Sequence, residues 1–274
     1  MGLVEVAVLG GIAGVVPLAL RDRIRGWVLV AAVVAVSFAL PVGPAAGLLA
    51  VTYPVAAALT GMRRLLDLRP GDWVPLVALG YAVAAGGALV CSRMGWTLLG
   101  TREPIVLLTA VHFSYAGVGA TMLAGRARAA VLTPTLRALA TVGLALAIGA
   151  PSVVALGFAT GWALPQVGGA VLVTAGVWAV ALVQLATARR PGPALGRALL
   201  VVSSLAVLAA MPLGVAWAAA QHWGTVPTLS VPALVRTHGM LNGVLFVPGG
   251  LLGWGRLVPS PPSGAPAARE AMAA

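Results

Sequence analysis

Long apolar segments separated by short polar connections make up most of the chain. Nine such segments lie at about residues 3–20, 26–40, 45–61, 73–91, 104–123, 135–158, 166–186, 198–219 and 232–254. A bilayer core about 30 Å thick is crossed by about 20 helical residues, so most of the segments are long enough to span it. The second is short and ends at the tight "PVGP" connection. The pattern predicts an all-α, polytopic transmembrane helical bundle of about nine helices, with eight possible.

Composition supports a membrane protein, because 60% of the residues are hydrophobic and only 8% are charged. The mean hydropathy of +1.02 excludes a water-soluble globular domain. The first segment carries Glu5 and lacks the basic start of a signal peptide, so we expect it to be retained as a helix. We expect residues 1–257 to form a single transmembrane domain. Residues 258–274 are rich in proline and alanine and predict a disordered cytoplasmic tail.

The charge balance is basic, with 17 basic and 6 acidic residues. Every basic residue is arginine, which indicates a compositional bias, and we expect no nucleic-acid partner. The single cysteine, Cys91, excludes an internal disulfide and a CxxC redox or metal motif. No nucleotide-binding fingerprint is present, and we expect neither a cofactor nor a resident metal.

The arginines alternate between the connections, and this alternation predicts an orientation. Cytoplasmic loops of membrane proteins are enriched in Arg and Lys. Fourteen of the 17 arginines follow the odd-numbered segments, and only Arg93, Arg102 and Arg236 lie on the other side. We therefore expect a multi-pass protein of the bacterial cell membrane with its N-terminus outside and its C-terminus in the cytoplasm.

The remaining ionisable residues gather in the predicted outer leaflet. Polar groups at membrane depth are costly and usually face a bundle interior or a cavity. In the 104–123 segment, His112 and Tyr115 share a helix face. In the last segment, His238 and Asn242 are spaced i, i+4 and also share a face. We hypothesise that these two faces join in one site.

Glu103 lies about 13 Å above His112 along an ideal helix and about half a turn away, so it reaches the same cavity only if it folds inward from the loop. It could instead be an acidic residue at a helix N-terminus, where the helix dipole favours negative charge. The histidines could be structural, each bonded to a backbone carbonyl. The outer tryptophans could form an interfacial belt. A metal held by His112, His222 and His238 lacks HExxH-like spacing.

Two stretches, "REPIVLLTAVHFSYAG" and "RTHGMLNGVLF", resemble the most distinctive parts of YndJ-like bacterial membrane proteins. That family is often described as transporters without an established substrate. The resemblance covers about 27 residues, and the rest of the chain matches only as apolar helix. It singles out five positions, namely Glu103, His112, Tyr115, His238 and Asn242.

Our leading hypothesis is an enzyme similar to small integral-membrane terpene cyclases, acting on a lipid-soluble prenylated substrate within the membrane. Proton-initiated cyclisation needs a protonated acid, aromatic faces that stabilise cations, and a base. Glu103 or Glu5 would be the acid, and His112 or His238 the base. Residues that could bind the substrate are Tyr115, Phe113, Asn242, Trp96 and Trp223. The chain has no Asp-rich diphosphate-metal motif, so protonation of an alkene or epoxide is the expected start.

Transport is the alternative hypothesis. Glutamate and histidine would then form a proton relay, and helices interrupted by proline would open and close the path. Four prolines lie inside predicted helices: Pro17, Pro54, Pro151 and Pro212. An odd helix number and the absence of a clear inverted repeat argue against this reading. An accessory membrane subunit would need no ionisable site at all. Under each hypothesis with a site, the partners are membrane lipids and a lipid-soluble small molecule.

Overall fold

A computed structural model describes residues 1–67, 73–130, 133–227 and 229–257. Within these ranges the chain forms nine continuous helical rods and no β-strand, as the apolar pattern predicted. Segments labelled η are π-helical. The rods are α1 (Leu3–Gly10) with η1 (Gly11–Val15) and α2 (Val16–Leu20); α3 (Ile24–Ala39); α4 (Pro44–Ala50) with α5 (Thr52–Leu66); α6 (Trp73–Met94); α7 (Ile105–His112) with η2 (Phe113–Ala120) and α8 (Thr121–Ala129); α9 (Pro134–Thr160); α10 (Ala163–Ala188); α11 (Ala194–Ala220); and α12 (Val231–Leu234) with η3 (Val235–Gly239), η4 (Leu241–Phe246) and α13 (Val247–Leu257).

Seven of the described helices are long and apolar enough to cross a membrane. The α3 helix is shorter, at 16 residues, and its length of about 24 Å falls below the thickness of the hydrocarbon core. The 231–257 helix has the length to span but is not among the seven. The protein is therefore an all-α, multi-pass membrane bundle. The predicted tail, residues 258–274, lies outside the described residues.

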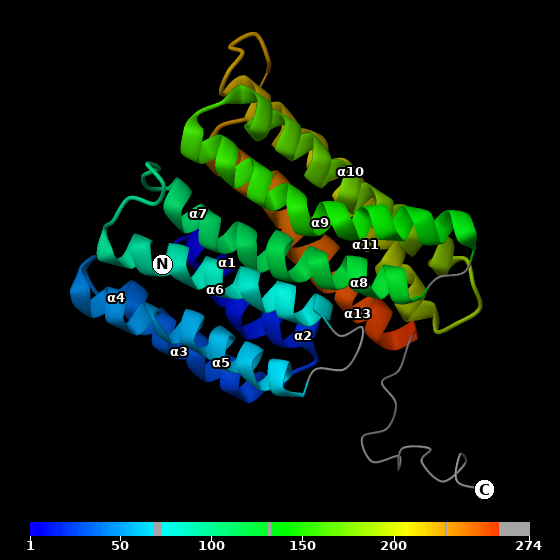
Figure 1. The fold of residues 1–274 in the computed structure, drawn as a ribbon, viewed down its shortest axis with the longest axis horizontal. Coiled ribbons are helices and arrows are strands. Elements are labelled where there is room, and N and C mark those ends of the chain that lie inside the picture. Colours follow the sequence, from blue (N-terminus) through cyan, green and yellow to red (C-terminus); the bar gives the residue numbers. More distant parts are fainter. Residues whose placement is uncertain (68–72, 131–132, 228, 258–274) are drawn as a thin grey trace, which may run out of the picture.

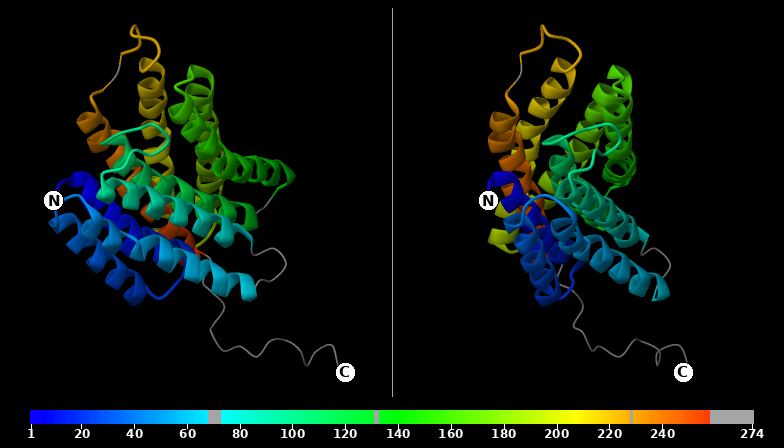
Figure 2. Two further views of the ribbon diagram at one scale, coloured as in Figure 1. Left: turned by 60° about the vertical axis from the view of Figure 1, so that its left-hand side comes forward. Right: turned by 90° about the vertical axis from the view of Figure 1, so that its left-hand side faces the viewer.

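Three of the rods run through the middle of the bundle: the 3–20 helix, the 105–129 helix and the 231–257 helix (Figure 1). The α3, α4, α5 and α6 helices lie on one side of them, and α9, α10 and α11 on the other. Figure 2 shows that α10 and α11 run at an angle to the α3–α6 group. The middle rods therefore connect two groups of helices that have few contacts with each other.

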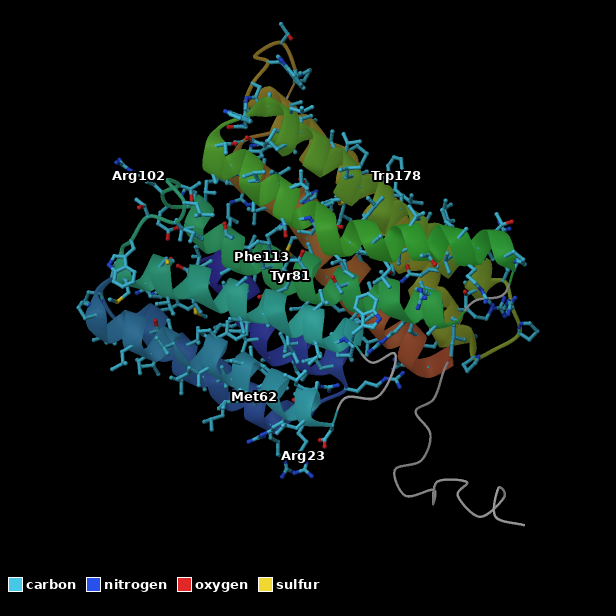
Figure 3. All side chains as sticks on the ribbon, in the orientation of Figure 1. Arg23, Met62, Tyr81, Arg102, Phe113 and Trp178 are labelled. Atoms are coloured by element: carbon cyan, nitrogen blue, oxygen red, sulfur yellow. The ribbon has the colours of Figure 1, made fainter. Side chains whose placement is uncertain are left out.

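The connections alternate between two ends of the bundle. We call the end with the connections at 20–24, 129–134 and 188–194 and the end of α13 the arginine-rich end. The other, arginine-poor end holds the start of α1 and the connections at 39–44, 94–105, 160–163 and 220–231. Figure 3 shows the labelled Arg102 and Arg23 at these opposite ends. Arg69 and Arg269 of the predicted arginine pattern lie outside the described residues.

Several arginines bind the carbonyl groups that a helix leaves unpaired at its C-terminus. Arg126 donates to the carbonyls of Leu18 and Ala19 at 3.0 and 2.9 Å, and also to that of Leu251 at 2.9 Å. Arg64 donates to the Leu20 carbonyl at 2.7 Å. The last four carbonyls of a helix have no partner within it, and cations are favourable there. These contacts tie α8, α2 and α13 together at the arginine-rich end.

The α9 and α10 helices are α-helical throughout and pack closely through glycines. A β-carbon on Gly169 would stand 2.7 Å from the backbone nitrogen of Val154. One on Gly143 would stand 3.2 Å from the carbonyl oxygen of Gly176. Small residues let membrane helices approach closely enough for van der Waals packing along their length. Pro151 interrupts α9 without a π-helical turn.

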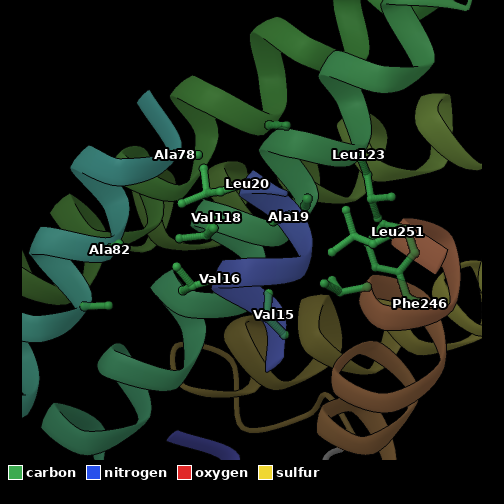
Figure 4. Packing of buried hydrophobic residues seen from close by; sticks show 14 of the residues in the cluster. Val15, Val16, Ala19, Leu20, Ala78, Ala82, Val118, Leu123, Phe246 and Leu251 are labelled. Atoms are coloured by element: carbon green, nitrogen blue, oxygen red, sulfur yellow. The ribbon is translucent and has the colours of Figure 1, made fainter. Parts of the chain in front are cut away.

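In contrast, each of the three middle rods contains π-helical turns. The η1 segment ends two residues before Pro17, and η4 ends two residues before Pro248. Proline cannot donate to the carbonyl four residues earlier and its ring crowds that turn, so a wider turn just before it fits the ring. Figure 4 shows buried side chains of the three rods in contact, from Val15, Val118, Leu123, Phe246 and Leu251.

Candidate functional site

Tyr115 lies where the three π-containing rods meet. It belongs to η2, and its hydroxyl donates to the carbonyl of Ala7 in α1 at 3.2 Å. Its ring lies beside Gly243 of η4, 3.5 Å from where a β-carbon would stand. A larger residue at Gly10 or Gly11 would also crowd Tyr115. The small residues of η1 and η4 thus make room for one aromatic side chain between three helices.

The neighbouring residue, Ser114, extends this polar contact toward α5. Its hydroxyl lies 3.0 Å from the hydroxyl of Tyr53, which is fully buried, and 2.9 Å from the carbonyl of Ala110. The Ala110 carbonyl can only accept, so the Ser114 proton points to it and Tyr53 donates to Ser114. Neither Tyr53 nor Ser114 was singled out from the sequence, because neither is ionisable near neutral pH.

His112 and His238 lie at the same depth in neighbouring rods. Each is the eighth residue of its rod, counted from Ile105 and from Val231, and both are therefore about 10 Å from the arginine-poor end of the rod. Their imidazoles are close enough to interact electrostatically. His112 is exposed on the surface of its rod, whereas His238 is partly buried. Packing therefore leaves the His112 imidazole uncovered.

His238 is held by α11 and by Asn242. Its Nδ1 lies 2.9 Å from the carbonyl oxygen of Ala210, which requires a proton on Nδ1. Its Nε2 is then the free acceptor of the neutral ring, and the Asn242 amide nitrogen lies 3.3 Å from it. The Oδ1 atom of Asn242 is buried and has no hydrogen-bond partner among the described residues. His238 and Asn242 are thus bonded to each other, and the Oδ1 of Asn242 is left as an acceptor without a partner.

One aromatic ring, that of Phe113, lies beside His112, and a second ring packs behind it. The Phe113 ring lies edge-on to His112 at 6.3 Å between centroids and packs against Tyr81 of α6 at 5.5 Å. Figure 3 shows Tyr81 and Phe113 next to each other in the middle of the bundle. Tyr81 also donates a hydrogen bond to the Ile148 carbonyl of α9. These aromatic faces could stabilise a nearby cation.

The two proposed acids occupy different places from the imidazole pair. Glu103 is exposed at the arginine-poor end, and its carboxylate accepts a hydrogen bond from the Leu107 amide in the first turn of α7 at 3.3 Å. Glu5 lies in the first turn of α1 and accepts from the Gly2 amide. Glu103 therefore does not fold inward from the loop toward His112. A carboxylate near unpaired helix N–H groups is favoured by those donors and by the helix dipole.

The two tryptophans that could bind the substrate also lie apart from His112 and His238. Trp96 and Trp223 are 56% and 50% exposed in arginine-poor connections, where an interfacial role suits them. His222 bonds the Gln166 side chain at 3.0 Å. In the described ranges, no group of three or more His, Cys, Asp or Glu side chains is arranged to hold a metal ion.

A second polar group, which the sequence analysis missed, lies deeper in the bundle. Ser203 and Ser204 of α11 lie 3.3 and 3.1 Å from the Gln184 amide oxygen of α10, and all three side chains are buried. Ser203 also donates to the Phe246 carbonyl at 2.8 Å. The signal was available in the sequence, because "VQL" and "VSSL" interrupt apolar runs, but a search for charge and histidine passes over neutral residues.

The family model described as YndJ-like protein matches residues 6–246, which include every π-helical turn and both histidines of the pair. No curated protein matches the chain. No solved structure matches it.

Proposed function

The chain belongs to the YndJ-like family, and we propose that it is a proton-coupled transporter of a lipid-soluble small molecule, with His112 and His238 as its proton-binding pair. The observation that carries this proposal is that His238 lies in the π-helical turn η3 and His112 directly before η2, within electrostatic range of each other. Wide π turns within α-helices are frequent at functional sites and mark places where a helix can change its geometry. A transporter needs both an exchangeable proton and helices that can rearrange around it.

Asn242 gives the pair a means of responding to a proton. Neutral His238 presents the Nε2 lone pair to the Asn242 amide nitrogen. A proton bound to Nε2 turns this acceptor into a donor, so the amide must rotate and present Oδ1, which now has no partner. Two imidazolium charges within electrostatic range would repel each other, so binding of one proton would disfavour binding of a second. Protonation would therefore reorient a side chain in contact with Met211 of α11.

The positions of the carboxylates favour transport over the leading hypothesis from the sequence. Acid-initiated cyclisation of an alkene or epoxide needs a carboxylic acid kept protonated by a dry site. Glu103 and Glu5 bind backbone amides at helix N-termini instead. A histidine pair with accessible surface suits reversible proton exchange better than protonation of a weakly basic alkene.

The test uses the third histidine as a matched control. Everted membrane vesicles that contain the protein are acidified by respiration, the pH gradient is followed with a fluorescent amine, and prenyl alcohols and amphipathic amines are added as probes. We expect at least one probe to dissipate the gradient with wild type and with His222→Gln, and not with His238→Gln or His112→Gln. A wild-type response in both pair variants would refute the proposed role of the pair.

A second candidate function is the terpene cyclase-like isomerase, and the aromatic contacts of Phe113 with Tyr81 and His112 favour it. These rings could stabilise a carbocation, and His112 could remove the final proton. Membranes carrying wild type, Glu103→Gln or Glu5→Gln would be incubated with a farnesylated aromatic compound and its epoxide. An isomeric cyclised product that depends on either carboxylate would restore this function. Equal product from all three would remove carboxylate initiation.

The proposed orientation places the arginine-rich end in the bacterial cytoplasm. The imidazole pair would then lie in the outer half of the membrane. Reporter fusions after residue 257 and within the 220–231 connection test this, with an inside signal expected from the first and an outside signal from the second. The opposite result would move the pair to the inner half.

A further inference from the structure

Buried polar atoms without partners gather along the 231–257 helix. Among the described residues, four buried side-chain atoms have no hydrogen-bond partner: Arg93 Nε, Gln184 Nε2, Asn242 Oδ1 and Trp254 Nε1. Asn242 and Trp254 belong to this helix. Gln184 Nε2 lies against it, 2.9 Å from where a β-carbon on Gly250 would stand. Three of the four atoms therefore lie on or beside one rod.

Four positions follow the side of that rod that faces α11: His238 and Asn242 contact Ala210 and Met211, and the Phe246 carbonyl and Gly250 lie against Ser203. Each of these four residues, and Trp254 after them, is four positions from the next. At about 1.5 Å per residue, the 16 steps from His238 to Trp254 cover about 24 Å. The row leads from the imidazole pair toward the arginine-rich end.

The gap between Asn242 and Trp254 is filled by the buried group on α10 and α11. Ser203 donates to the Phe246 carbonyl at 2.8 Å, and Ser204 donates to that of Leu200 at 2.8 Å. Both serine oxygens also lie 3.3 and 3.1 Å from the Gln184 amide oxygen, so the Gln184 amide nitrogen points to the other side, toward Gly250. The side chains of Ser203, Ser204 and Gln184 thus place polar groups beside Phe246 and Gly250, between Asn242 and Trp254.

We propose that a file of internal water molecules runs along this face, from His238 and Asn242 to Trp254 at the arginine-rich end. Unpaired buried donors and acceptors are costly, and internal waters commonly satisfy them. Separate water molecules along the file can accept from Gln184 Nε2 and Trp254 Nε1 and donate to Asn242 Oδ1. The inference rests on the proposed function. In that function, the file carries protons between the imidazole pair and the arginine-rich end of the bundle.

The test measures access of a small water-borne reagent to Ser203. In a Cys91→Ser background, Ser203→Cys carries the only thiol, and Val207→Cys is the control because Val207 is also buried and lies one turn away on α11. Proteoliposomes are treated with silver ion, and the remaining thiol is labelled after denaturation. Only the thiolate binds metal, and burial in apolar surroundings disfavours the thiolate. We therefore expect the free thiol of Ser203→Cys to disappear about tenfold faster than that of Val207→Cys. Equal protection of both thiols overturns the proposal.

A blocking substitution sharpens the result. Gly250→Ala would place a methyl group 2.8 Å from Ser203 Oγ and 2.9 Å from Gln184 Nε2, whereas Gly255→Ala meets nothing within 4 Å. We expect Gly250→Ala to slow the Ser203→Cys reaction and Gly255→Ala to leave it unchanged; equal rates in both contradict the file. Ser204→Cys replaces Ser203→Cys if the latter does not fold.

The two proposals fail separately. A reactive Ser203→Cys together with a pH gradient unaffected by His238→Gln would support the water file and refute proton coupling by the pair. A protected Ser203→Cys together with a histidine-dependent gradient would refute the file and leave coupling in place.

Discussion

The α9–α10 pair and the three π-containing rods pack in different ways. The α9 and α10 helices keep α geometry and press glycines against each other's backbone. The 3–20, 105–129 and 231–257 rods depart from α geometry and enclose tyrosine, histidine and asparagine side chains. Close packing of regular helices leaves no room for a polar ligand, whereas a widened turn supplies space and exposed backbone groups. The regular α9–α10 contact is thus filled by backbone and small residues, and the space for polar side chains lies among the middle rods.

The largest expected effect comes from breaking the glycine contact. Gly169→Val would place its side chain against the Val154 backbone, which cannot move aside as a flexible side chain would. We expect a loss of about 3 kcal/mol in the free energy of unfolding, at the upper end for overpacked sites. Thermal unfolding in detergent measures it. The adjacent Gly168→Val meets nothing within 4 Å and serves as control; equal melting temperatures would contradict tight α9–α10 packing.

A smaller loss is expected from Ser114→Ala in the middle rods. The buried Tyr53 hydroxyl would lose its acceptor at 3.0 Å, at a cost of about 2 kcal/mol for an unsatisfied buried group. The double variant Tyr53→Phe with Ser114→Ala removes both partners, so part of the stability should return. Unfolding of the two variants in the same detergent makes the comparison. A double variant less stable than Ser114→Ala would show that the hydroxyl pair is not what matters there.

The smallest expected effect is that of Glu103→Gln. The substitution removes a negative charge that lies just before the first turn of α7 but keeps a side-chain acceptor for the Leu107 amide. Helix-dipole interactions at exposed positions contribute about 0.5 kcal/mol, so the melting temperature should hardly change. The response of vesicles to probes should also match wild type. A complete loss of activity would return Glu103 to the centre of the mechanism.

The number of helices followed from hydrophobicity because a membrane span needs a long apolar run. Their limits followed less closely: the 134–160 and 194–220 helices start earlier and end later than their apolar cores, and Thr133 and Pro193 set where they begin. The π-helical turns were not predicted. Residues in η2 read as ordinary apolar helix, and only the prolines that follow η1 and η4 hint at a wider turn.

The candidate site was predictable in part. The spacing of His238 and Asn242 indicated a shared face, and their hydrogen bond has that geometry. The role of Glu103 could not be read from its position, because a residue before a helix can point into the bundle or back to its amides. Contacts such as Tyr53 with Ser114 join residues 61 positions apart, and no local pattern reports such a pairing.

Each π-helical turn holds one more residue than the α turn it replaces. In an alignment of relatives, η1, η2 and the η3–η4 stretch should therefore be the places where single-residue insertions and deletions gather. Deleting one residue from η1 would restore α register and rotate everything before it by about 100° relative to Pro17. The face that α1 offers to Tyr115 would then change while the apolar length stayed nearly the same. Relatives with equal hydropathy could thus differ in what they bind through one inserted residue.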